Sequence, residues 1–222
     1  MWQEVIVALI GAVVLFVVVR RVYKLFTRKS DGCGCSCDKC KSCAPPFRMD
    51  RLVKEEYFPL VDEQGETIGK ATRRECHSGS MLLHPVVHLH IFNEKGELYL
   101  QKRSETKDIQ PGKWDTAVGG HVDFGEKVED ALRREAREEL GVVGFVPTFI
   151  ERYIFESERE KEMVYAFRTV YTGAVVPDKE ELSDGKFWTI EDVEAELGKG
   201  TFTPNFENEY KRIIRSLWVS KD

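Results

Sequence analysis

Three glutamates near the middle of the chain, Glu135, Glu138 and Glu139, have a spacing that suits metal-assisted chemistry. Residues three and four apart on a helix share one face, so these carboxylates present oxygens at neighbouring points. Glu135 and Glu139 also fall inside the apolar stripe that begins at Val128, where a carboxylate is costly unless it is paired or binds metal. Such oxygen ligands favour Mg²⁺ or Mn²⁺, which can bridge phosphate oxygens and activate a water molecule.

The element that must position these carboxylates is a helix predicted from Glu126 to Leu140, with Gly141 ending it. Gly119-Gly120 lies just before it and lets the backbone turn tightly and approach a ligand. A solvated helix with ion pairs would explain the other charged residues of this segment, but not two inward carboxylates. We therefore favour the metal-binding interpretation.

The same residues fill a known pattern, the Nudix box: glycine, five residues, glutamate, seven residues, then Arg-Glu-aliphatic-any-Glu-Glu-any-Gly-aliphatic. Gly120, Glu126 and the run from Arg134 to Val142 occupy its defined positions, with Ala136 as a small aliphatic residue. Over about residues 55–215 the chain resembles Nudix hydrolases. Strands before and after one central helix fit the α/β/α sandwich with a mixed sheet that the resemblance implies.

The resemblance also implies an activity and roles for the box residues. The expected enzyme is a metal-dependent pyrophosphohydrolase, in which water attacks phosphorus in a nucleoside-diphosphate-linked or related small molecule. Glu135, Glu138 and Glu139 would bind the metal, and Glu138 or another acid would activate the water. Arg134 and Glu126 would orient the helix and its preceding loop.

Residues around the box narrow the resemblance to isopentenyl-diphosphate isomerase and its hydrolase-like relatives. The similar segments are Leu83-His84, His88, Gln101-Lys102-Arg103, Pro111–Trp114 and Gly119–His121. That isomerase holds a metal with three histidines and two glutamates, and the matching positions here are His77, His84, His121, Glu160 and Glu162. Imidazole and carboxylate together suit a divalent metal. The alternative is that His77 and His84 are surface or hinge residues and that Glu160 belongs to a run of charges.

Two further features bear on the substrate and the reaction. Gln101 and Arg103 share a strand face and, with Gly120, are candidates for substrate binding, although both side chains also suit an ordinary surface. The isomerase keeps a cysteine just before its Gly-His pair, where this chain has Gly119. Because the Nudix box is intact and that cysteine is missing, hydrolysis is favoured over isomerisation.

The N-terminus predicts a membrane anchor. Val5 to Val19 is an unbroken apolar run of 15 residues, followed by basic residues from Arg20 to Lys29. A span typically needs about 20 residues, which the flanking residues would complete. The positive-inside rule then predicts a single-pass protein of the cell membrane with its main domain in the cytoplasm. A cleaved signal peptide or a buried helix is the alternative.

Five cysteines follow the anchor: Cys33, Cys35, Cys37, Cys40 and Cys43. Thiolates at such spacings can converge on iron or zinc, and a flexible linker is the plainer alternative. The first 45 or so residues resemble small cysteine-rich membrane proteins associated with bacterial ferrous-iron transport. That resemblance implies a membrane location and a link to an iron-transport system.

The predicted domain organisation has three parts: a transmembrane helix with its basic flank at 1–29, a cysteine-rich linker at 30–47 and a Nudix domain at 48–222. Residues 52–222 carry a net charge of −10 by subtraction from the total of −5, which argues against a nucleic-acid partner. The expected partners are a small diphosphate and, through the N-terminal helix, a membrane. The alternatives to a hydrolase are an isomerase-like enzyme and a membrane iron-handling adaptor whose Nudix domain only binds ligand.

Overall fold

The computed structural model describes residues 55–219 apart from residues 108 and 180. The predicted transmembrane helix over Val5–Val19 and the cysteine segment at 30–47 lie outside this described part. Among the helices that are described, none is long and apolar enough to cross a membrane.

The described chain begins with a hairpin. Strands β1 (Tyr57–Val61) and β2 (Thr67–Thr72) pair antiparallel and form a two-stranded sheet of their own. Thr72 then caps a short helix, α2 (Arg73–Cys76), through a reciprocal pair of hydrogen bonds with Glu75. His77, the first of the predicted metal ligands, directly follows this helix. The cap therefore helps to fix the position of His77 relative to the hairpin.

The main sheet contains both parallel and antiparallel pairs, which confirms the mixed sheet predicted from the sequence. Its strands are β3 (Leu83–Phe92), β4 (Leu98–Arg103), β5 (Trp114–Thr116), β6 (Val118–His121), β7 (Thr148–Glu156), β8 (Lys161–Val170) and β9 (Leu182–Trp188). The order is β5-β4-β3-β8-β7, with β6 paired to β3 and β9 paired to β4. Strands β3 and β8 run parallel over their whole length, whereas the other pairs are antiparallel.

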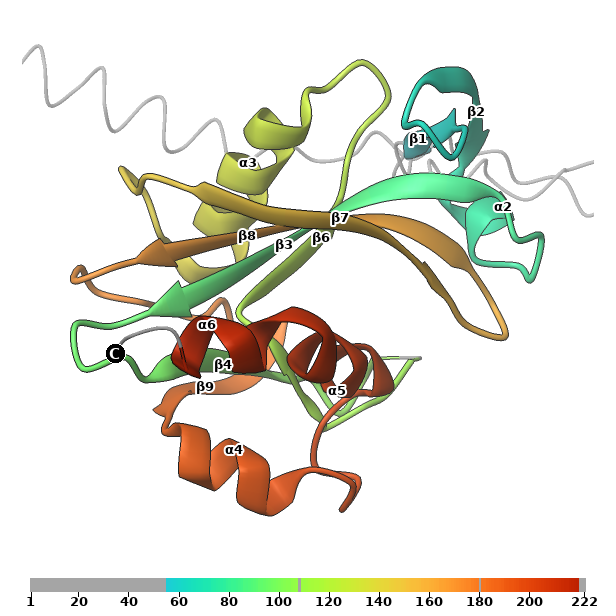
Figure 1. Ribbon diagram of the computed structural model, residues 1–222. Coiled ribbons are helices and arrows are strands. Elements are labelled where there is room, and N and C mark those ends of the chain that lie inside the picture. The colour runs from blue at the N-terminus through green and yellow to red at the C-terminus, as the bar shows by residue number, and fades with distance from the viewer. Residues whose placement is uncertain (1–54, 108, 180, 220–222) are drawn as a thin grey trace, which may run out of the picture. The chain divides into compact units, whose positions relative to one another are not determined.

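The sheet splays apart between β3 and β4. These strands pair only at Phe92 and Leu98, next to their connecting turn, because β6 occupies the rest of that edge of β3. The C-terminal helix lies in the opening (Figure 1). It comprises α5 (Pro204–Glu209), a π-helical turn (Tyr210–Ile214) and α6 (Arg215–Val219).

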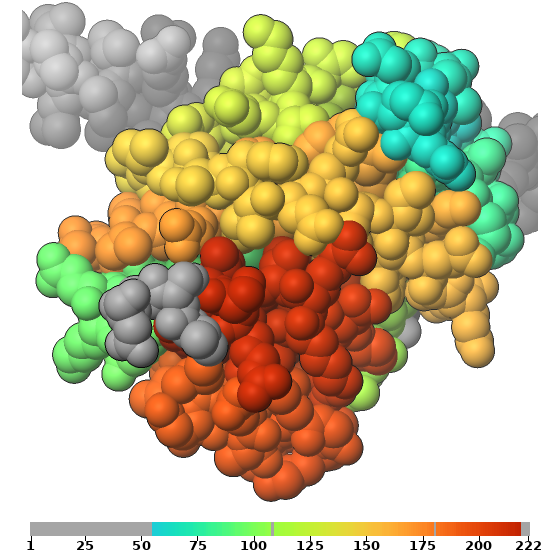
Figure 2. All heavy atoms as spheres, viewed as in Figure 1, coloured from blue at the N-terminus to red at the C-terminus, as the bar shows by residue number. Residues whose placement is uncertain are grey.

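The C-terminal helix and its neighbours form one of the two large apolar clusters. Phe206, Tyr210 and Ile214 pack there with Leu98 and Trp188 of the splayed strands. Helix α4 (Ile190–Glu196) contributes its buried Val193 to the same cluster. In the space-filling view the red C-terminal helix packs directly against the orange segment that contains α4 (Figure 2). This packing closes one face of the sheet.

Helix α3 (Val128–Leu140) covers the opposite face (Figure 1). Its buried Leu132 and Leu140 pack with Val87 and Leu89 of β3. Gly141 ends the helix in the left-handed conformation, with φ at 63°. Both faces of the sheet are therefore covered, and the predicted catalytic helix is anchored by its apolar side.

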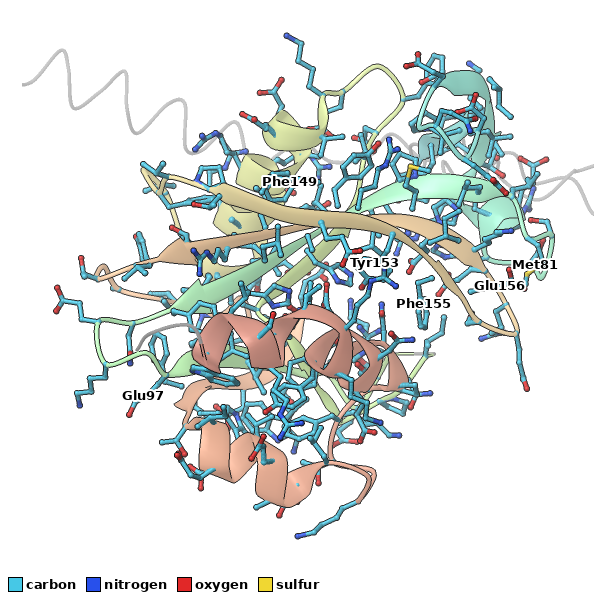
Figure 3. All side chains as sticks on the ribbon, in the orientation of Figure 1. Met81, Glu97, Phe149, Tyr153, Phe155 and Glu156 are labelled. Atoms are coloured by element: carbon cyan, nitrogen blue, oxygen red, sulfur yellow. The ribbon has the colours of Figure 1, made fainter. Side chains whose placement is uncertain are left out.

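Strand β7 changes the face it presents part-way along. A register shift between Phe149 and Glu151 inserts an extra residue against β8. Phe149 consequently contacts Phe167 in the cluster under α3, whereas Tyr153 packs in the cluster of the C-terminal helix. Figure 3 shows Phe149 on the side of α3 and Tyr153 on the side of the C-terminal helix.

Candidate active site

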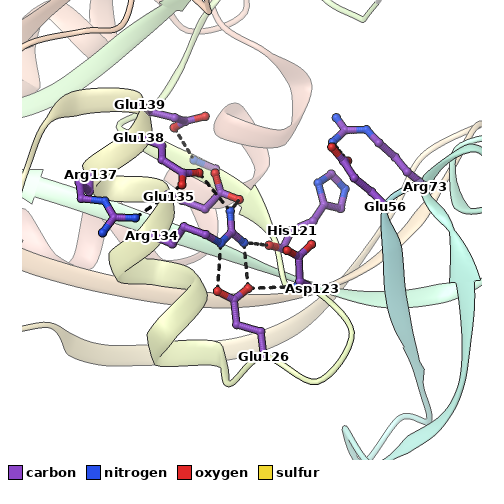
Figure 4. Close-up of polar contacts among 11 residues, drawn as sticks. Glu56, Arg73, His121, Asp123, Glu126, Arg134, Glu135, Arg137, Glu138 and Glu139 are labelled. Atoms are coloured by element: carbon purple, nitrogen blue, oxygen red, sulfur yellow. Dashed lines mark hydrogen bonds and ion pairs between the residues drawn. The ribbon is translucent and has the colours of Figure 1, made fainter. Parts of the chain in front are cut away.

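Arg134 ties helix α3 to the loop before it. Its Nε and Nη2 donate to the two oxygens of Glu126 at 3.0 and 2.9 Å, and Nη2 also donates to the carbonyl of His121 at 2.9 Å. Glu126 in turn accepts from the backbone N–H of Asp123 at 3.1 Å. Two parallel hydrogen bonds fix the guanidinium of Arg134 and the carboxylate of Glu126 in one relative orientation. The Arg134–Glu126 pair therefore sets where α3 begins relative to β6 (Figure 4).

Glu135 lies between Arg134 and the glycine before the loop. Arg134 Nη1 donates to Glu135 Oε1 at 2.7 Å. A Cβ placed on Gly120 would lie 2.1 Å from the carboxyl carbon of Glu135. Gly120 therefore has to be glycine for the Glu135 carboxylate to sit against the backbone of β6.

Glu139 and Glu138 extend the acidic face in two directions. Glu139 Oε2 accepts from the N–H of Gly119 at 3.3 Å. Glu138 is about half exposed, with 53% of its side chain accessible, and Arg134 Nη1 lies 3.4 Å from its Oε2. All three carboxylates line one cleft that encloses about 1240 Å³.

The electrostatics of these carboxylates fit a divalent cation. Burial and the neighbouring Glu135 raise the pKa of Glu139 to about 8. Burial also raises the pKa of Glu135, and Arg134 offsets part of that shift. Two partly buried carboxylates that repel each other are stabilised in their ionised forms by a hard cation, which takes oxygen ligands. The residues present therefore fit Mg²⁺ or Mn²⁺.

Three histidines predicted as ligands come together at the other end of the same loop. One nitrogen from each of His77, His84 and His121 lies within 4.8 Å of the other two. The Nε2 atoms of His77 and His121 are 3.0 Å apart, and Glu160 Oε2 lies 3.4 Å from His77 Nε2. Phe58 of β1 stacks on the ring of His121 at 4.3 Å between centroids.

The three histidines of this cluster are neutral imidazoles that could act as metal ligands. His84 Nδ1 donates to the carbonyl of Leu82 at 2.8 Å, which leaves its buried Nε2 without a hydrogen-bond partner among the described residues. Burial lowers the pKa of His77 to about 4 and also lowers the pKa values of His84 and His121. Unprotonated imidazoles with one nitrogen held by a carbonyl are typical metal ligands.

Glu162 lies beside this cluster, although its carboxylate is not part of the close group. It pairs with His84 in the β3–β8 ladder and is 8% exposed. Burial and the nearby Glu160 raise its pKa to about 7. The structure thus groups three of the five predicted ligands, places Glu160 against them and holds Glu162 on the adjacent strand.

The candidate substrate residues line the same cleft. Gln101 and Arg103 project into it from β4, and Gly120 borders it from β6. Sequence reasoning noted His88 as part of the family resemblance but gave it no role in the site, and it missed Lys70 and several residues around Asn205 in the lining. Alternation along β3 places His84 and His88 on one face and could have indicated such a role for His88. Asn205 is far away in the sequence, and no local pattern indicates it.

Comparison with known proteins agrees with this geometry. Residues 82–206 match the family model described as NUDIX domain, which spans more than half of the chain. The chain belongs to the Nudix family. Residues 3–44 match a second family model, described as FeoB-associated Cys-rich membrane protein, so this Nudix protein also carries a segment of a membrane-associated type.

Relatives extend over most of the Nudix domain. An uncharacterised Nudix hydrolase of Listeria monocytogenes is 33% identical over 152 residues, which cover 68% of this chain and 90% of that protein. The uncharacterised Nudix hydrolase YfcD of Escherichia coli K12 is 30% identical over 172 residues, covering 78% of this chain and 91% of that one. These relatives assign the chain to the Nudix pyrophosphohydrolases.

Solved structures show the same fold. A crystal structure of a Deinococcus radiodurans protein has a TM-score of 0.62 at 25% identity, covering 71% of this chain and 98% of that one. A MutT protein of Methanosarcina mazei has a TM-score of 0.52 at 28% identity, covering 61% of this chain and 95% of that one. None of these four proteins is named as an isopentenyl-diphosphate isomerase, so that resemblance stays a prediction.

Proposed function

We propose that this Nudix hydrolase cleaves the diphosphate of a nucleoside-diphosphate-linked or related small molecule, with Mg²⁺ or Mn²⁺ held by Glu135, Glu138 and Glu139. The observation that supports it is the pair of inward carboxylates, Glu135 and Glu139, which face a cleft and whose pKa values are raised by burial. When bound, the cation supplies positive charge beside the phosphate oxygens and favours ionisation of a water molecule.

The remaining box residues have supporting roles in this proposal. The accessible Glu138 takes the proton from the attacking water, because a general base must be reached by solvent and lie beside the reacting phosphorus. Arg134 and Glu126 keep the loop and the helix in register through their paired hydrogen bonds. Gly120 contributes backbone close to the phosphates. Gln101 and Arg103 contact the substrate from β4.

A panel of diphosphates tests the proposed reaction. The full-length protein is expected to split at least one nucleoside-diphosphate-linked compound into two phosphate-bearing products, with Mg²⁺ or Mn²⁺ present and not with excess chelator. Chromatography of the products identifies the cleaved bond. Isotopically labelled water should place its oxygen in one of the phosphates. Turnover that survives chelation of all divalent metal would contradict the proposal.

The isomerase remains a second candidate because the histidine cluster forms. Moving a double bond requires a proton donor on one face of the carbon framework and an acceptor on the other. Gly119, which stands where the isomerase has cysteine, offers no side chain to do this. We therefore expect isopentenyl diphosphate to give no dimethylallyl diphosphate. An enzyme-like rate of interconversion would reverse our ranking of the two reactions.

We also propose a second metal site at His77, His84 and His121, completed by Glu160 and Glu162. The close approach of three neutral imidazoles supports it. His84→Asn is expected to weaken zinc or manganese binding at this site by about 10–100-fold, measured by calorimetric titration. Glu156→Gln, at the exposed end of β7, is the control and should bind as the unmodified protein does. Equal affinity in both variants would refute the site.

The enzyme is proposed to be tethered to the cell membrane on its cytoplasmic side through a single N-terminal helix. The match of residues 3–44 to a membrane-protein family supports the tether. It also supports a link to iron transport, with iron or zinc at Cys33, Cys35, Cys37, Cys40 and Cys43. A non-catalytic adaptor is less favoured, because the carboxylates of the box are all present.

The tether predicts how the protein fractionates. The full-length protein should sediment with membranes and resist extraction by salt and alkali, whereas a version beginning at residue 48 should stay in the supernatant. Protease added to intact cells should leave the enzyme domain uncut. Recovery of full-length protein in the supernatant, or cleavage from outside the cell, would contradict the predicted topology.

A further inference from the structure

The cleft is also lined by polar side chains that the chemistry of the Nudix box does not use. His88 of β3, Gln101 of β4 and Asn205 of α5 all border the cleft. They come from three elements that meet where the sheet splays and the C-terminal helix enters. Two of them, Gln101 and Asn205, each have a buried polar atom without a hydrogen-bond partner in the described part of the chain.

Gln101 is the clearest of the three. The residue is 4% exposed. Its Oε1 atom is fully buried and has no hydrogen-bond partner among the described residues. The Oδ1 atom of Asn205 is also buried and has no hydrogen-bond partner among the described residues. Buried amides in folded proteins are normally hydrogen-bonded, so two such groups facing one cleft indicate a ligand that completes them.

Two other polar residues that line the cleft, Asp115 and Arg103, do have partners. Asp115 Oδ1 accepts from the hydroxyl of Thr203 at 2.8 Å, and its Oδ2 lies 3.5 Å from Arg103 Nη1. Arg103 Nε donates to the carbonyl of Ile109 at 3.1 Å. Gln101 and Asn205 therefore differ from these two neighbours in keeping an unpaired oxygen.

His88 is held so that one ring nitrogen faces the same space. Its Nδ1 donates to Glu209 Oε2 at 2.9 Å, and a Cβ on Gly119 would lie 3.7 Å from its Nε2. Because Gly119 has no side chain, this edge of the ring borders the cleft. Glu209 is fully buried and immediately precedes the π-helical turn. Such turns often occur at functional sites.

We propose that His88, Gln101 and Asn205 form a subsite for a polar, hydrogen-bonding part of the substrate, such as the hydroxyls of a sugar or the edge of a heterocyclic base. This rests on the proposed hydrolase function and narrows its substrate class. An alkyl chain in this space would bury the unpaired groups without satisfying them. A site built to hydrogen-bond a substrate group rejects analogues that lack the group by about 10⁴-fold. The proposed subsite therefore disfavours prenyl diphosphates as substrates.

Binding to an inactive enzyme tests the subsite without requiring turnover. Full-length Glu138→Gln protein is titrated calorimetrically, with Mg²⁺, with ADP-ribose, UDP-glucose, isopentenyl diphosphate and geranyl diphosphate. At least one of the two polar compounds should bind about 100-fold or more tightly than both alkyl diphosphates. Adding Gln101→Leu or Asn205→Leu should lower that preference at least about tenfold. Asn208→Leu, the same change at an exposed position on the C-terminal helix, should leave it unaltered.

The outcomes separate this proposal from the hydrolase proposal. Alkyl diphosphates that bind as tightly as the polar compounds would overturn the subsite, as would a preference that neither leucine variant reduces. If the unmodified protein hydrolyses a diphosphate, the hydrolase proposal stays intact even when one of these two binding results overturns the subsite. Failure of all four compounds to bind would overturn the subsite, whereas the hydrolase proposal is decided separately by the panel of diphosphates tested with the unmodified protein. Circular dichroism and thermal unfolding of the leucine variants check that each is folded.

Discussion

Glu139→Gln should lower kcat at least about a hundredfold while the protein stays folded. The substitution keeps the size of the side chain and removes a charge that the metal requires. Steady-state rates with saturating Mg²⁺ and saturating substrate measure the loss. Glu129→Gln, on the exposed first turn of the same helix, is the matched control and should retain full activity. A folded Glu139→Gln protein with normal turnover would remove this carboxylate from the mechanism.

The same variant should be more stable than the unmodified protein when metal is absent. The pKa of Glu139 in the folded protein, about 8, lies above its ordinary value, so the folded state binds more protons than the unfolded state between these values. Stability contributed by this group therefore falls as pH rises through that window. Glutamine does not titrate. The advantage of Glu139→Gln in unfolding experiments should be small at pH 4.5 and largest above pH 8, and a reversed trend would contradict the assigned burial.

Gly120→Ala should also reduce activity at least about a hundredfold, by displacing a carboxylate rather than removing it. The added Cβ would lie 2.1 Å from Cδ of Glu135 and 2.4 Å from its Cγ. Either β6 or the Glu135 side chain must then move, and the Arg134 bond to Glu135 breaks with it. Kinetic measurement should show that the metal concentration for half-maximal rate rises as kcat falls.

A control for Gly120→Ala is available elsewhere in the chain. Gly69 of β2 has only ordinary contact at its Cβ position, 3.9 Å from Leu60. Gly69→Ala should leave both activity and metal dependence unchanged. The Gly120→Ala protein could instead bind metal and turn over substrate as the unmodified enzyme does. That result would show that the close approach of Glu135 to Gly120 is not needed for the function of Glu135.

The sequence predicts the catalytic helix well because its signals are local. Helical periodicity places Glu135 and Glu139 on the apolar face, and the structure puts Leu132, Ala136 and Leu140 in the core beside them. The same holds for the caps: Thr189 accepts from the N–H of Asp192 at the start of α4, as its position suggests.

Long-range contacts explain what the sequence does not predict. The histidine cluster joins a residue after α2, one on β3 and one at the end of β6, so spacing alone could not group them. Family resemblance identified them instead. His88 and Glu209 are 121 positions apart, and their pairing depends on how the sheet splays. The bulge that reverses the faces of β7 likewise depends on its partner strand.

Placement of Glu209 has a practical consequence for choosing the smallest working fragment. The matched NUDIX segment ends at residue 206, before this carboxylate and before the buried Ile213 and Ile214. A protein trimmed to residues 82–206 would leave apolar surface open to water, and it would release the ring of His88. It would also lose Phe58, the aromatic lid on His121. The unit that folds and binds substrate therefore extends beyond the matched segment at both ends, and trimming it there would yield aggregation rather than a simpler enzyme.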